Sequence, residues 1–148
     1  MRPRAAAFDS EPVQERGDPV SRLPRAQEYL KTGFTAEAAS AAKFRAAAAR
    51  AQAEGRPNLA KAWLELAAEK DALAARQLEA AGQVRGGGDD LAAALAEERY
   101  ENDSLYPRMA REVDADTAAV LDGVAQKQRE HAARLESLLD ALTRSSGD

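Results

Sequence analysis

The chain has 148 residues, of which 45% are hydrophobic and 5% aromatic, and its 21 basic and 25 acidic residues give a formal net charge of -4. The absence of cysteine excludes disulfides, zinc–thiolate sites, iron–sulfur clusters and thiol catalysis within this chain. The mixed charge does not form the basic patch that nucleic-acid binding requires. No apolar run approaches the roughly 20 residues of a membrane span, and the N-terminus lacks the apolar region of a signal peptide. We therefore expect a cytoplasmic protein without nucleic-acid or membrane partners.

Much of the hydrophobic fraction is alanine, the best helix former, which predicts an all-α fold. Residues 1–22 are rich in Pro, Arg, Asp, Glu and Gly without any period, and we expect a disordered tail there. A short lead-in helix is predicted over 23–31 and ends at Gly33. The helical domain is predicted to cover residues 23–143, with a C-terminal tail over 144–148.

Four longer helices follow, each bounded by capping or breaking residues. Thr35 is a candidate N-cap and Gly55 a candidate stop for the first, and Pro57 fits the first turn of the second. A glycine-rich link precedes the third helix, in which Pro107 predicts a kink or local unwinding, and Asp114 marks the break before the fourth. Long helices with short links are typical of an up-down four-helix bundle. The predicted helices span residues 35–54, 57–81, 91–113 and 117–142.

Spacings of three and four residues place an ionisable group in the apolar stripe of every helix. On the fourth helix Gln128 and His131 interrupt a run of leucines and point the same way. Burying an unpaired charge costs several kcal/mol, so such a layer requires either ion pairing or a metal ion. The polar layer consists of Glu37, Lys70, Glu98, Glu101, Gln128 and His131. The stripe predicted for the second helix is Leu59, Ala62, Leu66, Lys70, Leu73 and Gln77.

The string from Glu98 to Pro107, ERYENDSLYP, resembles the third helix of the rubrerythrin branch of the ferritin-like proteins, which carries E-x-x-E followed by a Y-P pair. Glu37, with the aromatic Phe44 seven residues later and an Ala-Glu-Gly turn at Gly55, is similar to that family's first helix.

The resemblance covers roughly residues 30–143 and implies a dinuclear iron site, with glutamates from helices 1 and 3 and Glu-x-x-His from helices 2 and 4. In this sequence Gln128 replaces the glutamate before His131, and Lys70 and Leu73 occupy the glutamate and histidine positions of helix 2. An ammonium repels a metal ion beside it, so we expect one ion of iron or manganese rather than two. The residues matched to metal ligands are Glu37, Glu98, Glu101, Gln128 and His131.

Three functional hypotheses are open. The first is a metalloprotein that reacts with oxygen or peroxide, with Tyr106 and Tyr100 as redox-active or hydrogen-bonding phenols and a separate electron donor. The second is a metal-free helical scaffold or binding module in which Lys70 pairs with the core glutamates. The third is an oxidase or oxygenase in which Lys70 is an acid–base group or substrate anchor. We also expect a homodimer that forms through exposed apolar helix faces, for which Trp63 and Tyr29 are candidates.

Overall fold

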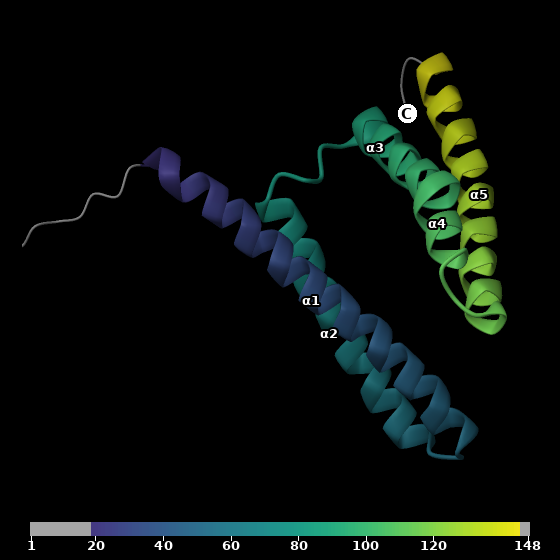
Figure 1. Ribbon diagram of the computed structural model, residues 1–148. Helices are drawn as coiled ribbons and strands as arrows, with labels where there is room; N and C mark the ends of the chain where they lie inside the picture. The colour runs from purple at the N-terminus through teal and green to yellow at the C-terminus, as the bar shows by residue number, and fades with distance from the viewer. Residues whose placement is uncertain (1–18, 146–148) are drawn as a thin grey trace, which may run out of the picture. The chain divides into compact units, whose positions relative to one another are not determined.

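The computed structural model describes residues 19–145, with side chains from residue 25 onward (Figure 1). The described part of the chain is helical apart from its connecting turns and contains no strand, which confirms the all-α class. The chain divides after Gln83 into two compact units. We call them the first hairpin (helices α1 and α2) and the second hairpin (helices α3, η1, α4 and α5). Residues 1–18 of the predicted N-terminal tail and 146–148 of the C-terminal tail lie outside the described residues.

Helix α1 runs without a break from Pro19 to Ala53, so the prediction of a separate lead-in helix is wrong. Gly33 does not end a helix. It lies inside α1, and the amide of Gln77 on α2 fills the space that a Cβ atom would need. Thr35 is likewise not an N-cap, since its hydroxyl donates to the Lys31 carbonyl 2.9 Å away, one turn back in the same helix.

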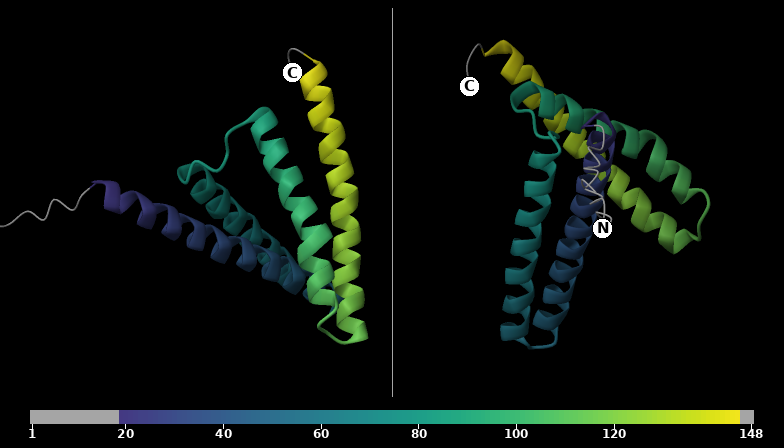
Figure 2. Two further views of the ribbon diagram at one scale, coloured as in Figure 1. Left: turned by 45° about the horizontal axis from the view of Figure 1, so that its top comes forward. Right: turned by 90° about the vertical axis from the view of Figure 1, so that its left-hand side faces the viewer.

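Helix α2 spans Pro57–Ala80 and lies antiparallel to α1, as the two views of Figure 2 show. The turn between them confirms Gly55 as the stop of the first helix. Its φ is 71°, and the Arg56 N–H donates to the Ala51 carbonyl at 2.9 Å. Pro57 occupies the first turn, as predicted.

The first hairpin packs through a seam of alanines at intervals of seven residues, the spacing of an antiparallel coiled coil. The buried members of the seam are Ala41 and Ala48 of α1 and Ala60, Ala67 and Ala74 of α2, followed by Ala81 at the C-cap of α2. The leucine positions of the predicted α2 stripe are therefore displaced by one residue, whereas Lys70 and Gln77 face α1 as predicted. Within this unit Leu59, Leu66 and Leu73 remain 42%, 44% and 47% exposed, because the small alanines beside them make the close contact.

The second hairpin begins with α3 (Gly87–Tyr100), continues through a π-helical turn η1 (Glu101–Leu105) into α4 (Tyr106–Ala110), and returns as α5 (Ala115–Arg144). The π-turn confirms the prediction of local unwinding near Pro107. A proline ring clashes with the carbonyl of an ordinary helical turn, and a wider turn relieves that clash. Asp114 caps α5, because its carboxylate accepts the Thr117 N–H at 2.9 Å.

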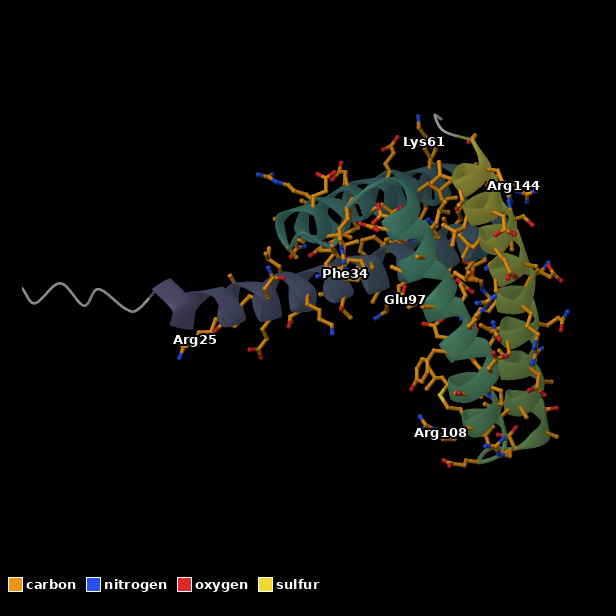
Figure 3. The ribbon with its side chains drawn as sticks, turned by 90° about the horizontal axis from the view of Figure 1, so that it is seen from above. Arg25, Phe34, Lys61, Glu97, Arg108 and Arg144 are labelled. Carbon is orange, nitrogen blue, oxygen red and sulfur yellow. The ribbon has the colours of Figure 1, made fainter. Side chains whose placement is uncertain are left out.

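Charged side chains cover the outer surfaces of both units. Figure 3 shows the exposed Lys61 and Arg108 pointing away from their helices. Within the described part of the chain, no helix combines the length and the apolar character that crossing a membrane requires.

Candidate functional site

Glu37 and Lys70 form an ion pair across the first hairpin. Lys70 Nζ lies 2.8 Å from Glu37 Oε2, and the lysine and glutamate side chains are 32% and 23% exposed. The Oε2 atom itself is buried and makes no aligned hydrogen bond, so the contact is chiefly electrostatic. The pair is therefore partly shielded from water, as the sequence predicted for the layer.

The heptad spacing of the hairpin sets the height of this pair. Phe44 and Trp63 pack against each other with ring centroids 5.0 Å apart and planes inclined at 47°. Glu37 lies seven residues before Phe44, and Lys70 lies seven residues after Trp63, so the next layer of the antiparallel pair brings cation and carboxylate together. The aromatic contact thus positions the charged one.

Helix α2 supplies no imidazole to the polar layer. Leu73, at the position matched to the family's histidine, is 47% exposed. A second cross-hairpin ion pair joins Arg45 to Asp71, and both of these side chains are about half exposed. The first hairpin therefore offers one carboxylate that already has a protein cation beside it.

In the second hairpin, Gln128 and Glu101 pair with each other. Gln128 on α5 is 8% exposed, and its Nε2–H donates to Glu101 Oε2 on η1. The amide must present its nitrogen here, because its oxygen would repel the carboxylate. The Gln128 Oε1 atom is buried without a partner. Glutamine at this position thus supplies a hydrogen-bond donor where a glutamate would supply a second negative charge.

His131 and Glu98 lie one turn away from that pair. His131 Nδ1 is 3.7 Å from Glu98 Oε2, an oxygen that is buried and has no hydrogen-bond partner. The glutamate side chain is 25% exposed and the histidine 59%, so the imidazole lies at an open rim. A shallow hollow of about 470 Å³ adjoins it. The lining residues are Ala94, Glu98, His131, Arg134, Leu135 and Leu138.

Tyr106 contacts the polar layer through its backbone, since its N–H donates to the Glu101 carbonyl and closes the π-turn. Tyr100 is 56% exposed. Sequence reasoning missed Asn102, which is 2% exposed in the same turn. Its spacing of seven residues from the buried Leu95 was the available signal.

The predicted site residues therefore form three pairs, each within one hairpin. Whether all six share a pocket stays a prediction. Among the residues whose side chains are described, no group of three or more His, Asp or Glu side chains could hold a metal ion. Each hairpin taken by itself thus falls short of the donor set that the resemblance implies for iron.

Of the two candidates for a dimer face, Trp63 is engaged with Phe44 inside the first hairpin, and Tyr29 is 67% exposed. No family model matches the chain, and no curated protein matches it.

Proposed function

We propose that this chain is a ferritin-like helical scaffold or binding module in which protein groups neutralise a carboxylate layer that holds metal in the proteins it resembles. The observation that carries this proposal is the 2.8 Å contact between Lys70 and Glu37. In the proposed form the long helices of the chain make an up-down four-helix bundle.

Electrostatics supports the scaffold over a two-metal centre. Two unit charges about 4 Å apart interact by roughly 4 kcal/mol at the effective dielectric of a protein surface, and a divalent ion doubles that figure. An ammonium at the position of Lys70 would therefore repel a nearby metal ion by several kcal/mol. The same ammonium stabilises Glu37 without any metal.

Hydrogen bonding also supports the scaffold. Gln128 donates to Glu101, so this carboxylate also has a protein partner. A scaffold needs a polar layer whose members satisfy one another, because unpaired buried charges destabilise a core.

The test is metal content combined with thermal stability. The full chain is produced with iron and manganese in the medium, analysed for metals, and melted with and without a chelator. We expect far less than one ion per chain and an unchanged melting temperature. The matched variant is Lys70→Glu with Leu73→His, which restores the ligand types of the family pattern and should gain metal. A full ion per chain in the wild type, lost in Glu98→Ala, would contradict the scaffold.

A second candidate function is a single-ion site on the second hairpin, which the buried Glu98 Oε2 without a hydrogen-bond partner favours. Glu98, Glu101 and His131, with Gln128, would hold iron or manganese, and Glu37 would stay paired with Lys70. Such an ion would supply redox chemistry with oxygen or peroxide, drawing electrons from a separate donor. Substituting His131→Ala and Glu98→Ala, each followed by metal analysis, separates this function from the scaffold.

A further inference from the structure

We infer that the hollow beside His131, within the second hairpin, binds a small zwitterion with an aliphatic side chain, a class to which leucine belongs. The inference rests on the proposed binding module and deepens it by naming the class of its ligand. The hollow measures about 470 Å³, which lies within the range of about 300–1,000 Å³ that is usual for small-molecule sites.

Glu98 supplies the negative charge of this site. Its Oε2 atom is buried without a hydrogen-bond partner, and the group beside it, His131 Nδ1, is 3.7 Å away, beyond hydrogen-bonding distance. The equivalent oxygen of Glu37 has the Lys70 ammonium at 2.8 Å. A ligand ammonium that enters the hollow therefore does for Glu98 what Lys70 does for Glu37.

Shielding strengthens that attraction. The Glu98 side chain is 25% exposed, so the carboxylate borders the hollow while one of its oxygens is removed from water. Charges near a protein interior interact more strongly than charges in bulk water, because the local dielectric is lower. Glu98 consequently attracts a cation more strongly than a fully hydrated glutamate would.

Arg134 supplies the positive charge of the site. It lines the same hollow with an exposed side chain, three residues after His131 on α5. Among the described side chains, the ion pairs between the helices of this hairpin join Arg99 to Glu136 and His131 to Glu98, and neither includes Arg134. The guanidinium is therefore free to bind a ligand carboxylate, which its planar donors fit well.

The two opposite charges restrict the class of ligand. A simple cation or a metal ion is attracted by Glu98 but repelled by Arg134, and a simple anion meets the reverse. A ligand that carries an ammonium and a carboxylate close together satisfies both groups at once. The hollow therefore favours a zwitterion over an ion of either sign.

The remaining lining is apolar and lies toward the other end of the hollow. Leu138 follows Arg134 by one helical turn on α5, and Ala94 precedes Glu98 by one turn on α3. Leu138 is 48% exposed, and Leu135 also lines the hollow. An aliphatic side chain attached to the charged groups covers this surface, which makes leucine a suitable probe.

The test is a titration of the full chain with L-leucine at constant pH. His131 is the chain's single histidine and lines the hollow, so its imidazole signals in the proton NMR spectrum report binding at this place. We expect saturable shifts with a dissociation constant on the order of 1 mM, as suits a small ligand in an open site. Leucinamide, which lacks the carboxylate, and 4-methylpentanoate, which lacks the amino group, should each bind at least about tenfold more weakly.

Variants locate the two charged contacts. Glu98→Gln and Arg134→Gln should each weaken leucine binding at least about tenfold. The matched controls are Glu97→Gln and Arg129→Gln, at exposed residues of the same two helices, and these should bind leucine like the wild type. If a charge variant fails to fold, the comparison of leucine with its two analogues on the wild type still decides the matter.

The absence of any imidazole shift up to about 50 mM leucine would overturn the inference, as would equal binding of leucine and either analogue. Unchanged leucine binding in folded Glu98→Gln or Arg134→Gln would overturn it as well. Metal analysis of the same sample separates this result from the scaffold. A metal-free chain that does not bind leucine keeps the scaffold and refutes the ligand site, whereas a full metal ion per chain together with leucine binding refutes the scaffold alone.

Discussion

Lys70 lies one heptad beyond Trp63, and its Nζ atom contacts Glu37 Oε2 at 2.8 Å in the layer next to the aromatic pair. Breaking a fully buried ion pair costs about 3–5 kcal/mol, whereas an exposed pair contributes about 0–1 kcal/mol. The side chains here are 32% and 23% exposed, which places the pair between those limits.

We predict that Lys70→Met lowers the free energy of unfolding by about 1–3 kcal/mol, because it leaves Glu37 shielded and without a cation. Glu37→Gln should have a similar effect. The double variant should lose clearly less than the two single losses combined, because the two residues act through one contact. Urea unfolding, followed by the fluorescence of the chain's single tryptophan, measures all three.

The control for this comparison of single and double variants is Arg45→Met with Asp71→Asn, at the half-exposed ion pair of the same hairpin. That pair should contribute at most about 1 kcal/mol. Additive effects of the Lys70 and Glu37 substitutions would show that the two residues do not interact, and the paired-layer interpretation would fail.

The second prediction concerns the aromatic contact that positions the ion pair. Phe44→Ala removes the ring that packs on Trp63 and should destabilise the protein by about 2–4 kcal/mol through lost burial and a cavity. Phe44→Leu should lose less, since most of the volume is kept. Tryptophan emission should shift to longer wavelength in the alanine variant, and an unchanged emission spectrum would show that Trp63 is not shielded by Phe44.

Much of the fold followed from local signals whose physics is short-range. Gly55 ends a helix because a left-handed backbone conformation is needed there, and Asp114 begins one because its carboxylate accepts a free N–H. Pro107 requires a local change in helical winding, because a proline inside any helix disturbs the turn before it. None of these three depends on the rest of the molecule, so the sequence alone could predict them.

Other features depend on tertiary packing that local signals do not contain. Gly33 looks like a helix stop in the sequence, because glycine often ends helices. In the structure it instead leaves room for the Gln77 side chain to approach α1, and the residue type alone does not distinguish the two roles. The leucine row of α2 was predicted to face α1, but the alanine row one residue further along the chain makes that contact. Rows through Ala60 and Leu59 have the same period, and only the close approach of the partner helix selects the alanine row.

The candidate site divides in the same way. Helical spacing predicted that Gln128 lies in the core, because that statement follows from the residues on one stripe. The choice of Glu37 as the partner of Lys70 depends on how two helices pack, and the sequence offered it only as one hypothesis among several. The exposure of His131 at 59% did not follow, since period alone cannot say how far a stripe is covered.

The third prediction is a dependence on pH at the start of α5. Hydrogen bonds from the Thr117 N–H and hydroxyl to the Asp114 carboxylate hold its pKa below the ordinary value of 3.8. A group with a lowered pKa stabilises the fold at pH values above its unfolded pKa, and this stabilisation is lost as the pH falls through its folded pKa. Asp114→Ala should therefore melt at a lower temperature than the wild type near neutral pH, and the difference should narrow in acid.

Asp114→Asn is the matched control for that measurement. Asparagine keeps a capping oxygen without a titrating carboxyl, so its melting temperature should stay near that of the wild type at neutral pH. A difference between Asp114→Ala and wild type that is constant from neutral to strongly acidic pH would show that the carboxylate charge contributes nothing to the cap.

The fourth prediction concerns the role of Gln128. It tests whether the Gln128 amide stabilises the protein by its hydrogen bond to Glu101, or only occupies a position where a glutamate would bind metal. Gln128→Glu places a second carboxylate against Glu101 Oε2, and two like charges at hydrogen-bond distance destabilise each other. We expect the free energy of unfolding to fall by about 1–3 kcal/mol at neutral pH, and this loss should shrink in acid as the two groups come to share a proton.

The control is Gln126→Glu, at an exposed residue of the same helix whose Oε1 accepts from Arg129, where the free energy of unfolding should change by no more than about 0.5 kcal/mol. If Mn²⁺ restores the stability of Gln128→Glu but does not affect the wild type, glutamine at this position is what keeps metal out. If Gln128→Glu is as stable as the wild type in neutral, metal-free buffer, the hydrogen bond to Glu101 does not hold the layer together.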